Sequence, residues 1–198
     1  MIVALLSGGV DSTAMVLRGY QEEKIVTVCV DYGQRSAPME ISAAFAVARK
    51  LDIPCDIVEI RGLELGAMNG DSEESRRVVP ARNAILLAVA TNIAEKDAIW
   101  DPWGEDGKLV SSNRVWIGAT RTDATDYPDT RKHFILSAQR FFLSGYGITV
   151  EAPLLMHDES SRSDRLKLCE SYGLTPWSCY APLSSGAPCG ACFSCQQD

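Results

Sequence analysis

Short apolar runs alternate along this chain with segments in which apolar residues recur every three to four positions. The apolar runs are IVALL (2–6), IVTVCVD (25–31), CDIVEI (55–60) and VWIGA (115–119), with a weaker fifth run, ITVEAP, at 148–153. Such nearly continuous apolar character is typical of strands that are covered on both faces. The pattern therefore predicts five strands in a sheet that has helices on both sides.

The intervening segments have the spacing of helices. They are DSTAMVLRGYQE (11–22), SAAFAVARKL (42–51), ARNAILLAVATNIAEK (81–96) and RKHFILSAQRFFLSG (131–145). Repeated strand–helix units indicate a doubly wound parallel sheet with right-handed crossovers. We therefore predict an α/β protein with a Rossmann-like fold.

Two segments interrupt this alternation. Residues 64–77 are polar and contain glycine, which is typical of a surface loop, either near a functional site or simply mobile. Residues 100–113 combine Trp100 and Trp103 with turn-forming residues. This second segment is compatible with a hairpin or lid, and equally with a packed excursion or a partner contact.

Composition and charge narrow the class of protein. A chain of 198 residues is long enough for one domain, or one domain with a small appendage. Its formal charge of −7 argues against non-specific nucleic-acid binding, which needs a cationic surface. The apolar start of the chain has no basic flank and is too short to span a membrane. We therefore expect a cytoplasmic protein without nucleic-acid or membrane partners, which leaves room for a small anionic ligand.

Four of the seven cysteines lie within the last twenty residues, at Cys179, Cys189, Cys192 and Cys195. A CxxCxxC run with one upstream cysteine fits a tetrahedral thiolate site for Zn²⁺. Disulfide-paired or simply exposed cysteines are the alternative, which a reducing compartment disfavours. Because protein ligands fill all four positions, we predict a structural zinc in a segment spanning 175–198, after a main domain spanning 1–174. The zinc would hold this segment near the active site.

The stretch LSGGVDST, residues 6–13, follows the first predicted strand and is called the glycine loop below. Gly8 and Gly9 allow a sharp turn that brings backbone N–H groups close to a ligand. Hydroxyl groups at Ser7, Ser12 and Thr13 and the start of a helix add further donors, an assembly that suits phosphate or pyrophosphate. Asp11 either caps the helix or helps to bind Mg²⁺. A plain turn is the alternative, since neither common nucleotide-binding fingerprint is present.

The sequence SGGVDS at the end of a first strand resembles the pyrophosphatase loop (PP-loop) of the ATP pyrophosphatase superfamily. Those enzymes transfer AMP to a carbonyl or carboxylate oxygen and release pyrophosphate. The resemblance implies the adenine nucleotide alpha hydrolase-like version of the fold. It also implies ATP contacts at Leu6, Ser7, Gly8, Gly9, Val10, Asp11, Ser12, Thr13 and Asp31.

Further segments resemble the 7-cyano-7-deazaguanine (preQ0) synthase family of queuosine biosynthesis. They are DYGQR (31–35), VPARNAILL (79–87), GATRTDATDYPDTRKHFI (118–135) and TPWSCYAPLSSGAPCGACFSC (175–195). They occur in the family's order and cover most of the chain. The resemblance implies a ligase that acts on 7-carboxy-7-deazaguanine with ATP and ammonia. It adenylates the carboxylate, forms an amide, and adenylates the amide to give the nitrile preQ0.

This resemblance assigns roles to individual residues. Asp11 and the glycine loop would hold the pyrophosphate with Mg²⁺, while Arg82 and Arg131 would neutralise charge during catalysis. The implied substrate contacts are Gln34, Arg35, Asn83, Asp123, Tyr127 and Asp129. Asp123 and Asp129 would accept N–H donors from the guanine-like edge. The alternatives are ordinary ones: a strand-end cap for Asp31, a solvated Arg35, and a turn with helix capping for residues 127–131.

The chain also departs from the family's pattern. Ser36 stands where the family usually has histidine, and Asp126 and Thr130 replace a glycine and a cysteine. The stretch HDESSRS (157–163) lacks the family's lysine and offers only Arg162 as a nearby cation. These departures leave open a paralogue that conjugates the activated carboxylate to another amine, such as a protein amine. A non-catalytic nucleotide-binding module with a protein partner is a more distant alternative. The resemblance further suggests a homodimer.

Overall fold

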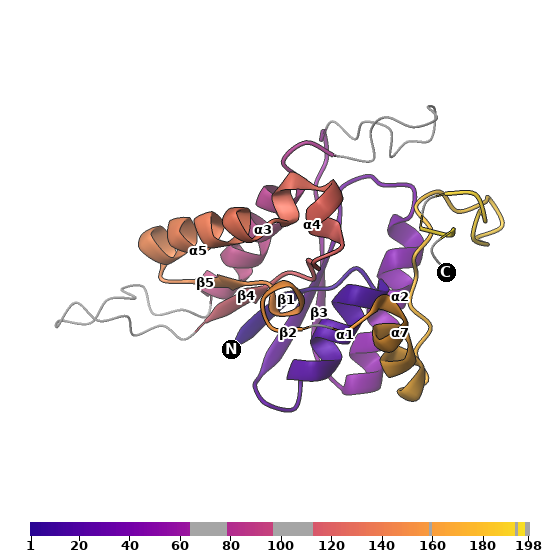
Figure 1. Ribbon diagram of the computed structural model, residues 1–198, viewed down its shortest axis with the longest axis horizontal. Helices are drawn as coiled ribbons and strands as arrows, with labels where there is room; N and C mark the ends of the chain where they lie inside the picture. The colour runs from indigo at the N-terminus through magenta and orange to yellow at the C-terminus, as the bar shows by residue number, and fades with distance from the viewer. Residues whose placement is uncertain (64–78, 97–112, 159, 193, 197–198) are drawn as a thin grey trace.

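The computed structural model describes residues 1–63, 79–96, 113–158, 160–192 and 194–196 (Figure 1). Five parallel strands form one sheet in the order β3-β2-β1-β4-β5. The strands are β1 (Ile2–Leu5), β2 (Ile25–Asp31), β3 (Cys55–Glu59), β4 (Arg114–Trp116) and β5 (Thr149–Glu151). The predicted parallel sheet is thus confirmed, including its weak fifth strand.

The strand order reverses direction at β1, which lies at the centre of the sheet. Val3 is paired with Val26 of β2 on one side and with Val115 of β4 on the other. The chain moves outward from β1 to β3 and then returns to β4 on the opposite side of β1. In open α/β sheets, ligands bind at the carboxyl ends of the strands at such a switch point. The fold therefore directs the search for a site to the ends of β1 and β4.

Helices cover both faces of the sheet. They are α1 (Val10–Gly19), α2 (Ala37–Leu51), α3 (Arg82–Lys96), α4 (Asp123–Asp126), α5 (Lys132–Tyr146), α6 (Pro153–Met156) and α7 (Arg162–Ser171), with a short 3-10 helix η2 (Pro128–Thr130). In Figure 1, α3 and α5 lie on one side of the sheet, and α1, α2 and α7 lie on the other.

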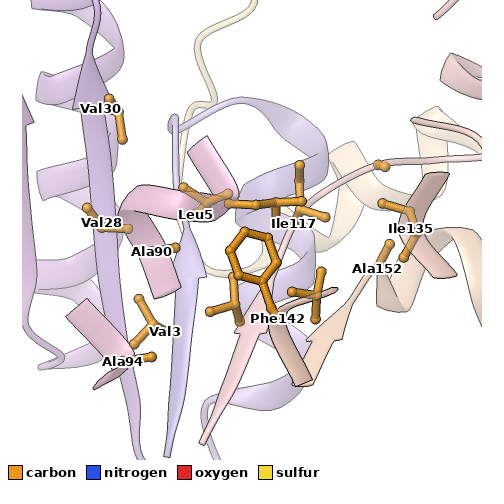
Figure 2. Close-up of a cluster of buried hydrophobic side chains, with 14 of the residues drawn as sticks. Val3, Leu5, Val28, Val30, Ala90, Ala94, Ile117, Ile135, Phe142 and Ala152 are labelled. Atoms are coloured by element: carbon orange, nitrogen blue, oxygen red, sulfur yellow. The ribbon is translucent and has the colours of Figure 1, made fainter. Parts of the chain in front are cut away.

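Each face of the sheet has its own hydrophobic core. Val3 and Leu5 point into the cluster shared with α3 and α5, where Figure 2 shows them near Ala90 and Phe142. The alternate residues Ile2 and Ala4 belong to the cluster shared with α1, α2 and α7. This burial on both faces explains why the central strand β1 has no polar position and why β2 has few.

The structure also differs from the sequence-based expectation in places. Helix α2 begins at Ala37, five residues before the predicted segment, because Pro38 is well suited to a first helical turn. Helix α7 was not among the predicted helices because its few apolar residues leave little periodicity. It begins with a capping box, in which the side chains and backbone of Ser161 and Asp164 bond reciprocally.

Two predictions cannot be compared with the fold. The loop at 64–77 and, apart from Asn113, the tryptophan-containing segment at 100–113 lie outside the described residues. Within the part of the chain that the structure describes, no helix is long and apolar enough to cross a membrane.

Candidate functional site

The glycine loop connects β1 to α1 through a turn that only glycine accommodates. Gly8 has φ of +71°, in the left-handed region that other residues rarely adopt. A Cβ atom at Gly8 would lie 2.4 Å from the Cβ of Ala43 and 2.7 Å from the backbone nitrogen of Ala44. The loop is therefore packed directly onto α2, and its backbone path is fixed.

Hydroxyl groups inside the loop form a compact set of hydrogen bonds. The Ser7 and Ser12 oxygens lie 3.2 Å apart, and the Ser12 hydroxyl donates to the Gly9 carbonyl at 3.2 Å. The Gly9 N–H contacts Ser7 Oγ at 3.4 Å. From the end of β4, Gly118 packs so closely that its Cβ would lie 3.1 Å from the backbone nitrogen of Ser12. Hydroxyl and N–H donors are thus gathered at the switch point of the sheet.

A cavity of about 260 Å³ opens beside this loop. It brings together many of the residues predicted from sequence, which are Leu6, Ser7, Gly9, Val10, Asp11, Ser12, Arg82, Asn83, Asp123 and Tyr127. They come from the glycine loop, the start of α3 and the segment after β4. Elements far apart in the sequence therefore meet around one cavity.

The cavity lining does not include Gly8, Thr13, Asp31, Gln34, Arg35, Asp129 or Arg131. Gly8 and Thr13 belong to the loop's framework, and Thr13 is fully buried with a hydroxyl that has no hydrogen-bond partner within the described residues. Arg35 is exposed. The ligand-binding roles assigned to these residues stay predictions.

Gln34 organises the turn after β2. Its amide nitrogen donates to the Val30 carbonyl at 3.2 Å and to Glu40 Oε2 at 2.9 Å, while its amide oxygen accepts the Tyr32 N–H. Asp31 accepts the N–H of Gly33 at 2.9 Å. These contacts place Tyr32 and Glu40 in the cavity wall.

Asp129 and Arg131 connect the segment after β4 to its neighbours. The backbone oxygen of Asp129 accepts a hydrogen bond from the Asn83 side-chain amide at 3.1 Å. The Asp129 side chain accepts the backbone N–H of Asn83 at Oδ2, 3.4 Å away. Arg131 is exposed and donates from Nε to the Ala124 carbonyl at 3.1 Å. In this structure Asp129 therefore fixes the position of Asn83 at the start of α3.

Arg82 supplies a cation to the cavity from the start of α3. Burial lowers the pKa of its guanidinium, but Tyr32 and Asp129 outweigh that effect and the pKa is raised. Burial raises the pKa of the Tyr32 phenol, which lies next to Arg82. Because Arg82 is a permanent cation with several donors, it is suited to bind a phosphate or carboxylate group.

Helix α7 provides two cations near the loop. Arg165 donates from Nε to Asp11 Oδ1 at 2.6 Å, and Arg162 donates to the Ser178 hydroxyl at 3.0 Å while lining the cavity. Burial raises the pKa of Asp11, although the Arg165 charge opposes this effect. Sequence reasoning missed Arg165. The only local signal was the S-x-x-D capping box at residues 161–164, which marks a helix start without indicating what the helix contacts.

The four C-terminal cysteines form a candidate metal centre. Their sulfur atoms all lie within 4.8 Å of one another. A tetrahedron of sulfurs around zinc has edges of about 3.8 Å, which these positions accommodate with small shifts. Backbone N–H groups of Ala191 and Cys192 lower the pKa of the Cys189 thiol to about 6, whereas burial raises the pKa of the Cys179 and Cys195 thiols. The donor set therefore fits a bound metal ion.

The segment that carries these cysteines also forms part of the cavity. The Trp177 N–H donates to the Gly8 carbonyl at 2.9 Å, and the Trp177 indole donates to the Cys179 carbonyl at 2.8 Å. Ser178, Tyr180 and Ser194 line the cavity together with Trp177. Sequence reasoning placed the segment near the site but identified none of these four residues. Their proximity to the cysteines was the only signal available.

The whole chain is similar in sequence to known proteins. The family model described as "Queuosine biosynthesis protein QueC" matches residues 1–198. The 7-cyano-7-deazaguanine synthase of Pseudomonas fluorescens is 32% identical over 219 residues, covering 98% of this chain and 87% of that protein. The enzyme of the same name from Frankia casuarinae is 33% identical over 221 residues, covering 98% and 85%.

A solved structure titled as a predicted subunit of a tRNA methyltransferase from Methanocaldococcus jannaschii is 16% identical. The match covers 83% of this chain and 73% of that protein's chain, with a TM-score of 0.47. By contrast, the family match extends over the whole chain. The sequence shared with this family over the whole chain shows that this chain belongs to the QueC family of queuosine biosynthesis proteins.

Proposed function

We propose that this protein uses ATP to activate the carboxylate of 7-carboxy-7-deazaguanine and converts it, with ammonia, into the nitrile preQ0. The observation that carries the proposal is the shared cavity. It combines a loop of phosphate-type donors, the cation Arg82 and the carboxylate of Asp123 at the switch point of the sheet. The named relatives support the choice of substrate.

ATP would bind at the glycine loop. The hydroxyls of Ser7 and Ser12 lie at the N-terminus of α1, where the helix dipole and free backbone N–H groups stabilise anionic groups. Asp11 lines the cavity at the same point and is suited to hold the Mg²⁺ that accompanies the pyrophosphate. Magnesium would neutralise the leaving group, while the loop fixes its position.

The deazaguanine would lie on the opposite side of the cavity. Asp123 is held in place because its Oδ2 accepts the N–H of Thr120 at 2.9 Å and the Thr120 hydroxyl at 2.8 Å. A fixed carboxylate suits the N–H donors of a guanine-like edge and rejects bases that lack them. Tyr127 and Tyr180 complete this wall, and Arg82 would hold the carboxylate that reacts.

The proposed chemistry proceeds through two activations. A carboxylate oxygen attacks the α-phosphorus of ATP, and pyrophosphate leaves. Ammonia then attacks the acyl carbon, and AMP leaves with the former carboxylate oxygen to give the amide. The amide oxygen then attacks the α-phosphorus of a second ATP, and pyrophosphate leaves. Loss of AMP from the carbon and of both protons from the nitrogen gives the nitrile. The protein's contribution is to align the reactants and stabilise the displaced charge.

We assign the metal centre a structural role, with Zn²⁺ as its metal. Residues 1–174 would form the nucleotide-binding domain and residues 175–198 the metal-binding segment. Four sulfur ligands leave no position for a reacting water. The contact between Trp177 and Gly8 supports this role, because it links the metal-binding segment to the loop that would bind ATP.

A larger amine acceptor is the second candidate, and Glu40 favours it. Its carboxylate lines the cavity, held by the Ser36 hydroxyl at 2.6 Å and the Gln34 amide at 2.9 Å. The Glu40 carboxylate is bonded to Ser36, the residue that stands where the family usually has histidine. Its negative charge would attract a cationic amine. In this version the activated carboxylate forms an amide with, for example, a protein amine.

A product assay distinguishes these candidates. Metal-replete protein is incubated with Mg-ATP and 7-carboxy-7-deazaguanine, with and without ammonium, and the products are identified by mass spectrometry. The main proposal predicts AMP and a nitrile that forms only with ammonium. AMP without nitrile would direct the search to another amine. No substrate-dependent AMP would contradict both, and would favour a binding module instead.

A further inference from the structure

Arg165 is a buried cation next to the glycine loop. The reaction proposed above gives it no role. Only 6% of the Arg165 surface is exposed to solvent. Nε donates to Asp11 Oδ1 at 2.6 Å, and Nη1 donates to the Ser160 carbonyl at 2.5 Å. A guanidinium this deeply buried is costly unless its partners are well placed. The partners seen here are therefore the reason that the position tolerates arginine.

A ring of contacts holds Arg165 against helix α1. Asp158 accepts hydrogen bonds from the Ser160 N–H and hydroxyl, both at 2.8 Å. Arg18, from the last turn of α1, contacts Asp158 at 2.5 Å and donates to the Ser160 hydroxyl at 3.2 Å. Asp11, in the first turn of α1, binds Arg165 directly. Arg18, in the last turn of the same helix, contacts Ser160, whose carbonyl is the other partner of Arg165.

The surroundings of Asp11 show why a cation is needed there. Asp11 and Asp123 both line the cavity, and the negative charge of Asp123 disfavours the ionised form of Asp11. Arg162 and Arg165 of α7 supply the opposing positive charge, and Cys169 of α7 is also close enough to interact. Of these groups, Arg165 is the one with a direct hydrogen bond to Asp11 among the contacts described.

We propose that Arg165 is a positioning residue of the ATP site, which fixes the Asp11 carboxylate through Oδ1 so that its other oxygen faces the magnesium–pyrophosphate group. This inference rests on the proposed function, because it assumes that the glycine loop binds Mg-ATP. It adds a residue from helix α7 that acts through Asp11 and does not itself touch the nucleotide.

Calorimetric titration with Mg-ATP tests this role in four variants: Arg165→Met, Arg165→Lys, Asp11→Asn and the double variant Arg165→Met with Asp11→Asn. Loss of Arg165 should raise the dissociation constant for Mg-ATP about 10- to 100-fold, because the Asp11 carboxylate loses the charged hydrogen bond that orients it. In the Asp11→Asn background the same change should have an effect below about threefold, because its target is gone. Arg165→Lys keeps the charge and should bind Mg-ATP more tightly than Arg165→Met.

Two controls separate positioning from general stability. Lys167→Met removes a cation from the exposed side of the same helix and should change the dissociation constant by less than about twofold. Titration of ATP in the presence of a magnesium chelator should show a smaller loss in Arg165→Met than titration with Mg-ATP does. A purely structural role would weaken both titrations equally.

The outcomes are distinct. Equal Mg-ATP affinity of the unaltered protein and Arg165→Met would overturn the inference, as would an undiminished effect of the change in the Asp11→Asn background. Absence of any Mg-ATP binding by the unaltered protein would overturn the proposed function and the role of Arg165 with it. If Arg165→Met fails to fold, the same cycle run with Arg165→Lys and Asp11→Asn decides by the same criterion.

Discussion

Removing the metal from the four C-terminal cysteines is expected to abolish Mg-ATP binding and AMP formation while the central sheet stays folded. The cysteine segment provides the Trp177 contact to Gly8 and four residues of the cavity wall. It has little apolar core of its own, and Leu183 is 53% exposed. Metal binding supplies about 10–16 kcal/mol in small zinc domains, so the segment's order depends on it. The two cores that flank the sheet consist largely of residues before 175.

The matched variants are Cys192→Ser, which removes a metal ligand, and Cys55→Ser, which alters a thiol in β3. Metal content, circular dichroism and Mg-ATP affinity are measured for each. We expect Cys192→Ser to lose metal and nucleotide binding with little change in the circular dichroism of the sheet and helices. Cys55→Ser should retain both. A metal-free protein that still forms AMP at the normal rate would refute the link between the two sites.

Gly8→Ala is expected to destabilise the protein and to eliminate Mg-ATP binding. Alanine at φ of +71° is strained by roughly 1–2 kcal/mol. Its Cβ would lie 2.4 Å from the Cβ of Ala43, so α2 or the loop must move. Overpacking of this kind costs about 1–3 kcal/mol. The same shift would displace the Gly8 carbonyl that accepts the Trp177 N–H.

Urea denaturation of Gly8→Ala should show a loss of about 2–5 kcal/mol in the free energy of unfolding. Gly145→Ala is the matched control, because an added Cβ there meets nothing within 4 Å and the residue lies within α5. It should leave Mg-ATP binding intact and stabilise the helix by up to about 1 kcal/mol. A Gly8→Ala protein with unchanged stability and nucleotide affinity would show that the loop is not packed as described.

The fold followed from the sequence because its main signals are local. Strands buried on both faces leave runs such as IVTVCVD, and amphipathic spacing indicated the long helices α3 and α5. Helix α7 was missed because its buried residues include Arg165, a charged side chain where the pattern expects an apolar one. Arg165 forms an ion pair with Asp11 of α1, a long-range contact that sequence spacing does not encode.

The candidate site was predictable only where a group of residues forms a distinctive motif. The glycine loop follows β1 and the four cysteine sulfurs cluster, as the motifs predict, while the binding roles assigned to both stay predictions. Gln34 and Asp129 could not be resolved, because an amide or carboxylate that orders a turn has the same signature as one that binds a ligand. Tyr180 joins the cavity only because the cysteine segment folds back onto the glycine loop, a long-range contact with no local signal.

The most direct test of the central claim uses 7-carboxy-7-deazaguanine labelled with oxygen-18 in its carboxylate, incubated with Mg-ATP and ammonium. Mass spectrometry of the AMP then reports whether the carboxylate oxygen attacked the α-phosphorus. Adenylation of the substrate predicts that each AMP formed with product contains one labelled oxygen. Unlabelled AMP, formed by attack of water on ATP, would contradict the account.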